Sequence, residues 1–247
     1  MNAVETTTQL RRLWKLAFGD SEDFLDLFFS RIFSPERCHY LTRESQVAAA
    51  LYWFDIECDN QKFAYLYAVA THPNHRGRGL CRNLMVETQD LLTAKDYAGI
   101  LLVPQDDALR RMYRKMGYVD CTSIAQFSVP SGEPIPMTKL SPEEYGRLRK
   151  SMLPPHSVIQ EGRSLEFLGL LGEFYAAEGF LATVSKENGT LRCLEYLGDP
   201  ALAPGLVATL GCREGIFRSP GDQFPFAQYL PLKDGCPKPE YFAFAFD

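Results

Sequence analysis

Leu66-Tyr-Ala-Val-Ala-Thr-His-Pro-Asn-His-Arg-Gly-Arg-Gly-Leu-Cys-Arg-Asn-Leu84 is the stretch that decides the fold. Residues 64–71 are apolar and aromatic and contain no Gly or Pro, which is typical of a buried strand. Residues 72–79 form a turn with one Pro, two Gly and two Arg, and apolar residues return at helical spacing from Leu80. Backbone N–H groups freed by such a turn and by a helix start can point at an anion. The stretch therefore predicts a phosphate-binding site between a strand and a helix.

The composition is that of an ordinary globular protein. The chain has 247 residues, of which 46% are hydrophobic and 23% charged, so a sizeable core is expected. The net charge of −5 argues against bulk binding to nucleic acid or to anionic membranes, since both favour basic surfaces. Arg76, Arg78 and Arg82 nevertheless form a local basic patch.

The cysteines and the N-terminal sequence indicate the cellular compartment in which we expect the protein. Seven cysteines are scattered along the chain and none lies in a Cys-x-x-Cys pair, which indicates reduced thiols rather than a disulfide framework. The first residues lack the basic and then apolar pattern of a signal peptide. No run of about 18 apolar residues is present that would cross a membrane. We therefore expect a soluble cytoplasmic protein.

The first half of the chain predicts helix, helix, three strands, helix, strand, helix and strand. The expected bounds are 6–18, 22–33, 39–43, 46–56, 62–71, 80 to a C-terminal end near 94–97, 99–103, 108–116 and 118–129. The three consecutive strands suggest an antiparallel meander, with a hairpin turn at 55–60. The continuous apolar run Gly99-Ile-Leu-Leu-Val103 is typical of a strand buried on both faces and parallel to a neighbour.

The second half follows a linker. Pro130-Ser-Gly-Glu-Pro-Ile-Pro136 has three Pro and one Gly, so we expect domains at 1–130 and 137–247 joined by residues 131–136. Expected helices are 142–152, 164–175 and 200–210, a hairpin joins 180–185 to 190–197, and late strands are 216–218, 226–230 and 241–246. The alternation of large and small residues in the last of these predicts a strand that packs one face.

The element order and the turn together resemble the GNAT acetyltransferase superfamily. Its signature is Arg or Gln, two residues, Gly, one residue, and Gly or Ala; Arg76, Gly79 and Cys81 occupy those places. Cys81 departs from the pattern but is small enough to be tolerated. The resemblance covers residues 6–129 and implies an α/β (α+β) GNAT fold: a mixed, mostly antiparallel sheet flanked by helices, followed by a smaller C-terminal α+β domain.

The resemblance implies that the acyl donor is acetyl-CoA. Backbone N–H groups of residues 76–81, with the positive end of the helix, suit its pyrophosphate. In this family the strand before the turn bulges, and its splayed edge pairs with the pantetheine amides and polarises the thioester oxygen. The residues assigned to the donor are Val69, Ala70, Thr71, Arg76, Gly77, Arg78, Gly79, Leu80 and Cys81.

A second match concerns catalysis. Ala108, Tyr113 and Gly117-Tyr118 resemble the family's later helix, where an aromatic hydroxyl is followed four residues on by Gly and an aromatic. Tyr113 is therefore the candidate general acid that protonates the leaving thiolate; the alternative is a core aromatic. No general base stands out among Asp55, Glu57 and His72.

Other site types fit worse. The pair Gly77-x-Gly79 lacks the third Gly of a dinucleotide fingerprint, and no Gly-Lys-Ser/Thr follows for a P-loop. His72 and His75 flank a Pro in a turn and lack further clustered ligands, so we expect no metal.

The second half carries no further Arg-x-x-Gly-x-Gly. Its element order, and residues 190–198, are nevertheless similar to a degenerate second GNAT-like unit, as in tandem members; the alternative is a lid or dimerisation domain of another topology. In either case we expect it to shape the acceptor pocket, with Glu195 facing that pocket or paired in a salt bridge.

The leading hypothesis is an N-acetyltransferase that moves an acetyl group from acetyl-CoA to a primary amine by direct attack in a ternary complex. The acceptor is a small-molecule or peptide amine, and we expect no nucleic-acid or membrane partner. The alternatives are a non-catalytic acyl-CoA sensor and an aminoacyl transferase on the same fold, against which the acidic balance argues. The acceptor's identity and the choice between monomer and homodimer stay open.

Overall fold

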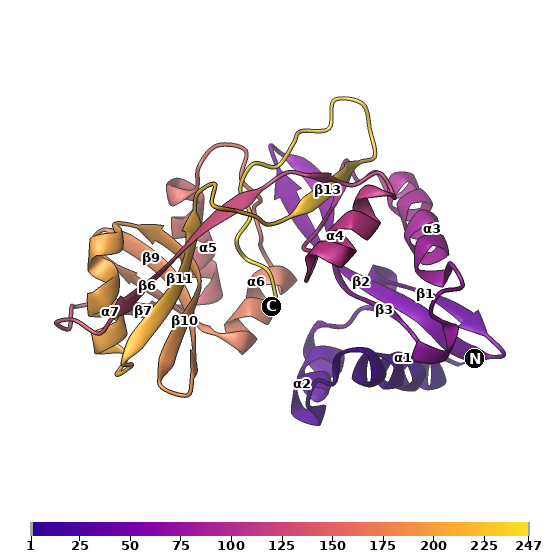
Figure 1. The fold of residues 1–247 in the computed structure, drawn as a ribbon, viewed down its shortest axis with the longest axis horizontal. Coiled ribbons are helices and arrows are strands. Elements are labelled where there is room, and N and C mark those ends of the chain that lie inside the picture. The colour runs from indigo at the N-terminus through magenta and orange to yellow at the C-terminus, as the bar shows by residue number, and fades with distance from the viewer. Residues whose placement is uncertain (1, 247) are drawn as a thin grey trace. The chain divides into compact units, whose positions relative to one another are not determined.

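The structure is a computed structural model that describes residues 2–246 (Figure 1). The chain divides into two compact units. Unit 1 comprises Met1–Asp55, Gln61–Leu102 and Leu230–Cys236, and unit 2 comprises Ile56–Asn60, Val103–Tyr229 and Pro237–Asp247. The expected linker at residues 131–136 lies within unit 2, where Gly132 N donates to Pro204 O at 3.0 Å. In the described part of the chain, no helix is both long and apolar enough to cross a membrane.

Two helices begin unit 1. Helix α1 (Ala3–Phe18) ends at Gly19, whose φ of 76° is the left-handed conformation expected of a glycine cap. Helix α2 (Glu22–Leu27) begins at Ser21, whose side chain accepts from Phe24 N. It continues as a π-helical turn, η1 (Phe28–Ile32), so the single helix expected at 22–33 is two segments with different hydrogen bonding. Phe28 and Ile32, at the two ends of this turn, are both buried.

The sheet of unit 1 follows a 3-10 turn, η2 (Pro35–Arg37). Its strands are β1 (Cys38–Arg43), β2 (Gln46–Cys58), β3 (Gln61–Thr71) and β4 (Gly99–Leu102), in the order β1-β2-β3-β4, with β13 (Gln228–Pro231) next to β4. Strand β1 pairs antiparallel with β2. The turn between β2 and β3 is only Asp59-Asn60, both with positive φ as a type I′ hairpin requires. The turn expected at 55–60 was therefore too long, because residues 55–58 keep strand alternation, with Ile56 and Cys58 buried and Glu57 exposed.

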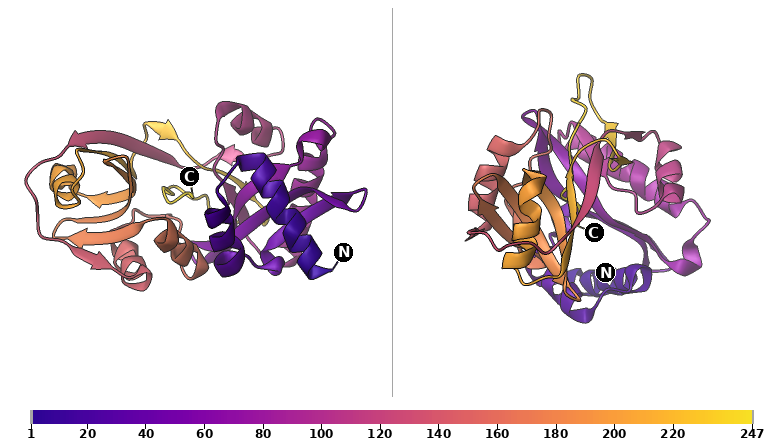
Figure 2. Two further views of the ribbon diagram at one scale, coloured as in Figure 1. Left: turned by 90° about the horizontal axis from the view of Figure 1, so that it is seen from below. Right: turned by 60° about the vertical axis from the view of Figure 1, so that its left-hand side comes forward.

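Helix α3 (Leu80–Ala94) forms the crossover from β3 to β4, which run parallel as the apolar run 99–103 predicted. Its buried face is Leu80, Leu84, Met85, Thr88 and Leu92. Rings on β2 and β3 pack against Trp14 of α1, and the views in Figures 1 and 2 place α1 and α3 on opposite faces of this sheet.

Unit 2 begins with helix α4 (Asp107–Arg114), capped by Asp106, whose carboxylate accepts from Leu109 N at 2.7 Å. The strand expected at 118–129 is broken into β5 (Val119–Asp120) and β6 (Ser123–Pro130). The two parts have different partners: β5 pairs with β13, whereas β6 pairs with β11 (Glu214–Pro220) and β12 (Phe224–Pro225). The chain leaves one sheet for the other between them, where Thr122 Oγ1 accepts from Ala227 N.

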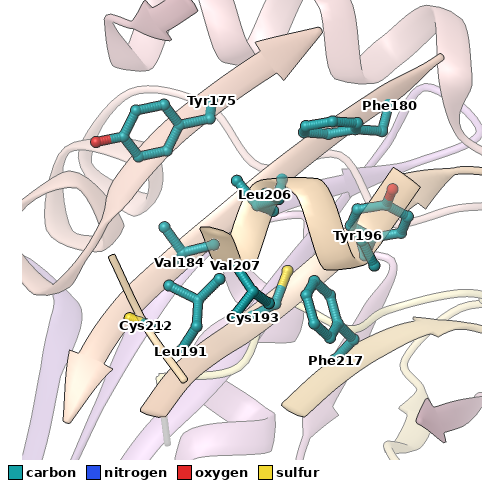
Figure 3. Packing of buried hydrophobic residues seen from close by; sticks show 12 residues of the cluster. Tyr175, Phe180, Val184, Leu191, Cys193, Tyr196, Leu206, Val207, Cys212 and Phe217 are labelled. Carbon is teal, nitrogen blue, oxygen red and sulfur yellow. The ribbon is translucent and has the colours of Figure 1, made fainter. Parts of the chain in front are cut away.

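The sheet of unit 2 has the strand order β12-β6-β11-β10-β9-β8-β7. The strands not yet described are β7 (Thr138–Leu140), β8 (Glu173–Ala177), β9 (Phe180–Glu187) and β10 (Thr190–Gly198). The helices are α5 (Pro142–Met152), α6 (Arg163–Leu171), η4 (Pro200–Leu202) and α7 (Ala203–Thr209). Figure 3 shows Leu206 and Val207 of α7 packed over Leu191, Cys193 and Phe217 of the sheet.

Two further expectations for unit 2 were wrong. The helix expected at 164–175 ends at Leu171, because Gly172 is extended and residues 173–177 pair with β7 and β9 as strand β8. The tail 241–246 is not a regular strand: it forms one bridge, between Ser157 and Tyr241. All six of its residues are at most 8% exposed, so they have no solvent face to alternate with. By contrast, the hairpin joining β9 to β10 and the start of α5 at Ser141 are confirmed.

Candidate functional site

Strand β3 loses its β4 partner halfway along its length. The parallel pairing runs from Phe63–Gly99 to Tyr65–Leu101 and stops there, while β3 continues to Thr71. The opposite edge of β3 stays close to β2, since His72 N donates to Ala48 O at 2.8 Å. The segment 66–71, which contains the predicted residues Val69, Ala70 and Thr71, therefore has one edge that β4 does not cover.

The backbone of β3 is distorted within this segment. Ala68 has φ 50°, a left-handed conformation that is uncommon for a residue with a Cβ and interrupts the regular strand. The next two residues differ in burial: Val69 is partly exposed and Ala70 buried. The resemblance implied a bulge in the strand before the Arg-Gly turn, and the distortion at Ala68 lies in that strand.

The turn itself needs glycine for conformational reasons. Gly77 and Gly79 have φ of 73° and 75°, and a Cβ placed on either one would have no heavy atom within 4 Å. Backbone conformation, rather than crowding within the chain, therefore selects glycine at both positions. Arg76 closes the turn onto the strand, because its Nε donates to Thr71 O at 3.2 Å.

Helix α3 begins without a side-chain cap. Gly79 is its N-cap residue, and the first intrahelical bond is from Asn83 N to Gly79 O at 3.0 Å. The N–H groups of Leu80, Cys81 and Arg82 precede that bond and have no partner within the helix. Arg78 and Arg82 are exposed beside them. The helix start thus combines free donors, the positive end of the helix and two cations.

Tyr113 lies on α4, in unit 2, whereas the turn and α3 belong to unit 1. Its side chain is 6% exposed and its ring meets that of Tyr118 edge to face, with centroids 5.8 Å apart. The backbone N–H of Tyr118 also donates a hydrogen bond to the carbonyl oxygen of Tyr113. Its catalytic role stays a prediction.

The three candidate bases lie at different distances from the end of β3. Asp55 accepts from Arg37 Nε at 3.1 Å and from the Tyr97 hydroxyl. Ala48 of β2 lies opposite the end of β3, and Asp55 is seven positions further along β2. At strand spacing this separation is about 23 Å, which argues against a role for Asp55 as the base. Glu57 is still further along β2 and is exposed. His72 directly follows β3, and its Nδ1 accepts from Asn74 N at 3.2 Å.

Asp55 instead makes unit 1 sensitive to acid. Burial alone raises the pKa of Asp55, but hydrogen bonds from Arg37 and Tyr97 outweigh it and hold the pKa below its ordinary value. The stabilisation is complete above the unfolded-state pKa of about 3.9 and is lost as the pH falls through the lower, folded-state value. We expect urea unfolding of Asp55→Asn to depend less steeply on pH below about pH 4 than that of the unaltered chain. Equal slopes would contradict this, and Asp222→Asn, an exposed loop change, is the control.

The two histidines of the turn do not form part of a larger ligand cluster. The ring centroids of His72 and His75 are 5.6 Å apart. Among residues 2–246, no group of three or more His, Cys, Asp or Glu side chains is placed to hold a metal ion. All seven cysteines are free thiols, as their spacing predicted.

An aromatic cluster supports the strand that precedes the turn. Six rings lie with centroids 4.5 to 6.0 Å from that of Trp14; they belong to Phe18, Phe24, Phe28, Phe29, Tyr52 and Tyr67. Tyr67 is the residue immediately before the distorted Ala68. The cluster was not anticipated as a unit, although the aromatic residues at alternate positions of β2 and β3 were a signal for it. It holds α1, α2 and η1 against the strand that carries the predicted donor site.

In the parallel β3-α3-β4 crossover the two strands part beside a glycine turn and an uncapped helix start, an α/β arrangement that can bind an anion. Residues 4–119 match a sequence profile described as an acetyltransferase (GNAT) domain. The N-terminal part of the chain therefore belongs to the GNAT acetyltransferase family. A search of curated protein sequences gave no match.

Solved structures share this fold over nearly the whole chain. A GCN5-related N-acetyltransferase from Kribbella flavida is 17% identical, with a TM-score of 0.68, covering 94% of this chain and 71% of that one. One from Anabaena variabilis is 15% identical, with a TM-score of 0.70, covering 93% and 71%. A tandem GNAT protein from the clavulanic acid biosynthesis pathway is 15% identical, with a TM-score of 0.55, covering 95% and 97%. At these identities the likeness concerns the fold alone.

Proposed function

We propose that the chain is an N-acetyltransferase that moves an acetyl group from acetyl-CoA to a primary amine by direct attack in a ternary complex. The observation that carries the proposal is the edge of β3 that β4 leaves unpaired beyond Tyr65, next to the glycine turn and the uncapped start of α3. A long donor with a pyrophosphate at one end and amides along its arm matches that sequence of hydrogen-bonding groups. The acceptor is a small-molecule or peptide amine, and the compartment is the cytoplasm.

Each part of the site has a role in this proposal. Backbone N–H groups of residues 76–81 hold the pyrophosphate, and Val69, Ala70 and Thr71 pair with the pantetheine arm. A backbone N–H of β3 stabilises the thioester oxygen as it gains charge. The amine nitrogen forms the new bond to the carbonyl carbon, the carbon–sulfur bond breaks, and Tyr113 gives its proton to the departing thiolate. The proton lost by the amine passes to a base that the residues do not single out.

The second half of the chain is, in this proposal, a degenerate GNAT-like unit with its boundary at residues 131–136. Helices α5 and α6, strands β8 to β10, helix α7 and strand β11 repeat the order of α1, α2, β1 to β3, α3 and β4. Both crossovers join parallel strands, β3 to β4 and β10 to β11. Its task would be to shape the acceptor pocket.

The proposal is tested by thiol release from acetyl-CoA against a broad panel of amines, with CoA affinity measured by calorimetry on the same preparation. Turnover on one class of amine supports it. Tight CoA binding without turnover on any amine would favour a non-catalytic sensor, and absence of CoA binding would contradict the donor site itself.

A glycine substitution probes the donor site separately. Gly79→Ala forces a Cβ into the left-handed region at a cost of about 1–2 kcal/mol and turns the N–H groups of the helix start. We expect CoA affinity to fall about fivefold or more, together with thermal stability. Gly211→Ala is the matched control, since Gly211 has φ 71° and equally open space but lies in the turn after α7. It should lower stability alone; an equal loss of CoA affinity in both variants would contradict the assignment.

A further inference from the structure

Strands β10 and β11 of unit 2 part in the same way as β3 and β4. Their parallel pairing runs from Thr190–Glu214 to Cys193–Phe217 and stops. Strand β10 continues to Gly198 beside β9, and its register with β9 shifts between Cys193 and Glu195. A bulge therefore lies at the parting of β10 from β11, and in β3 the distorted Ala68 lies three residues beyond the corresponding parting at Tyr65.

Each of these strands is connected to the tail, residues 241–246, just beyond the point where the strands part, directly on β11 and through Arg149 on β10. On β11, Arg218 directly follows the last paired residue, and its Nη1 donates to Ala243 O at 2.9 Å. On β10, Glu195 directly follows the bulge and binds Arg149, whose guanidinium lies 5.0 Å from the ring centroid of Phe244. The groups just beyond the parting on each strand thus reach the same short segment.

The tail is fixed by backbone as well as side-chain bonds. Tyr241 O accepts from Val158 N at 2.9 Å, and Phe244 O accepts from Gln160 Nε2 at 3.1 Å. The Phe244 ring also lies 5.6 Å from that of Tyr145. With all six residues buried, the segment is packed as core.

The turn that follows β10 differs from the turn after β3 in charge. Both turns begin with a capped 3-10 segment: His72 Nδ1 accepts from Asn74 N before η3 (Pro73–His75), and the Asp199 carboxylate accepts from Ala201 N at 2.9 Å before η4. The helices that follow, α3 and α7, both begin without a side-chain cap. Unit 2 therefore has a carboxylate at the position where unit 1 has an imidazole, and the charge of Asp199 opposes a second anion.

We propose that the tail fills, in unit 2, the position that the pantetheine arm takes in unit 1, and that the carboxylate of Asp199 opposes a pyrophosphate at the turn after β10. Unit 2 consequently has no donor site, and the chain binds one acetyl-CoA. This inference rests on the proposed function for the identity of the donor, but the occupation of the gap by the tail is a separate claim.

Two measurements test it. Calorimetric titration of the unaltered chain with CoA should give one site per chain; two sites would overturn the proposal. Hydrogen exchange should rise at least about tenfold at residues 195–197 and 218–219 in Phe244→Ala, because loss of the ring opens the gap. Exchange at residues 63–71 and CoA affinity should not change.

The control and the remaining outcomes separate this claim from the proposed function. Phe224→Ala removes a ring that is 50% exposed in the same unit and should leave exchange at both segments unaltered. Unchanged exchange in Phe244→Ala would overturn the role of the tail. If Phe244→Ala does not fold, Gln160→Leu takes its place, because it removes one hydrogen bond to Phe244 O. Hydrogen exchange at the same two segments should again rise. A chain that binds no CoA contradicts the proposed function, while the exchange data still decide whether the tail fills the gap.

Discussion

Replacing Tyr113 with Phe is expected to lower kcat by about 100-fold while CoA affinity stays nearly unchanged. Positioned general acids contribute about 10²- to 10⁴-fold, and the phenol is the group that would protonate the thiolate. Phe keeps the ring and its edge-to-face contact with Tyr118, so the packing of this side chain, which is 6% exposed, is preserved. The measurement is steady-state thiol release, with CoA binding followed separately.

The control for Tyr113→Phe is Tyr118→Phe. It makes the same chemical change on a buried ring whose centroid is 5.8 Å away, with no assigned role in proton transfer. Turnover should change little in that variant. Equal losses in both variants would assign the effect of Tyr113 to packing, and full activity of Tyr113→Phe would exclude it as the acid.

The strand, turn and helix around the donor site were predictable because their signals are local. Pro73, Gly77 and Gly79 punctuate the chain where the strand must end and the helix begin, and the structure places these boundaries at Thr71 and Leu80. The capping box at Ser141 and Glu144 likewise fixed the start of α5. Each of these features depends on residues within a few positions of one another.

Two of the expectations that were wrong concern segments whose conformation depends on distant partners. The break at residues 121–122 exists because β5 and β6 pair with strands about a hundred residues further along the chain. The tail has strand-like alternation, but contacts from α5, β11 and residues 158–160 bury it on every side. No local pattern specifies such contacts.

In the candidate site, too, the features that depend on neighbouring residues were predictable and those that depend on distant residues were not. The predicted donor residues come from one contiguous stretch, so their proximity followed from the sequence. The base did not, because the position of a carboxylate in the fold decides its use: Asp55 is tied to Arg37 and Tyr97 at the far end of β2. Glu195 was expected either at a pocket or in a salt bridge, and its partner Arg149 is 46 positions away in the chain.

Replacing Arg149 with Met is expected to cost about 3–5 kcal/mol in the free energy of unfolding of unit 2. Arg149 is 1% exposed and Glu195 is fully buried; the guanidinium meets both carboxylate oxygens, with Nε–Oε2 at 2.6 Å and Nη2–Oε1 at 2.9 Å. Arg149 also donates to Val158 O, and the Tyr145 hydroxyl donates to Glu195. Removing the cation leaves a buried carboxylate without its counter-charge, which costs more than the pair itself contributes.

A double replacement separates the pair from the cost of breaking it. In Arg149→Met/Glu195→Met no charge stays buried, so most of the loss should be recovered, because apolar groups of similar volume can replace a buried ion pair. Lys139→Met, which breaks the exposed pair with Glu173, should change stability by less than about 1 kcal/mol. Urea unfolding measures all three variants, and CoA affinity should be equal in those that stay folded. If the double variant were as unstable as Arg149→Met, the loss would come from packing around α5 and the tail rather than from an uncompensated charge.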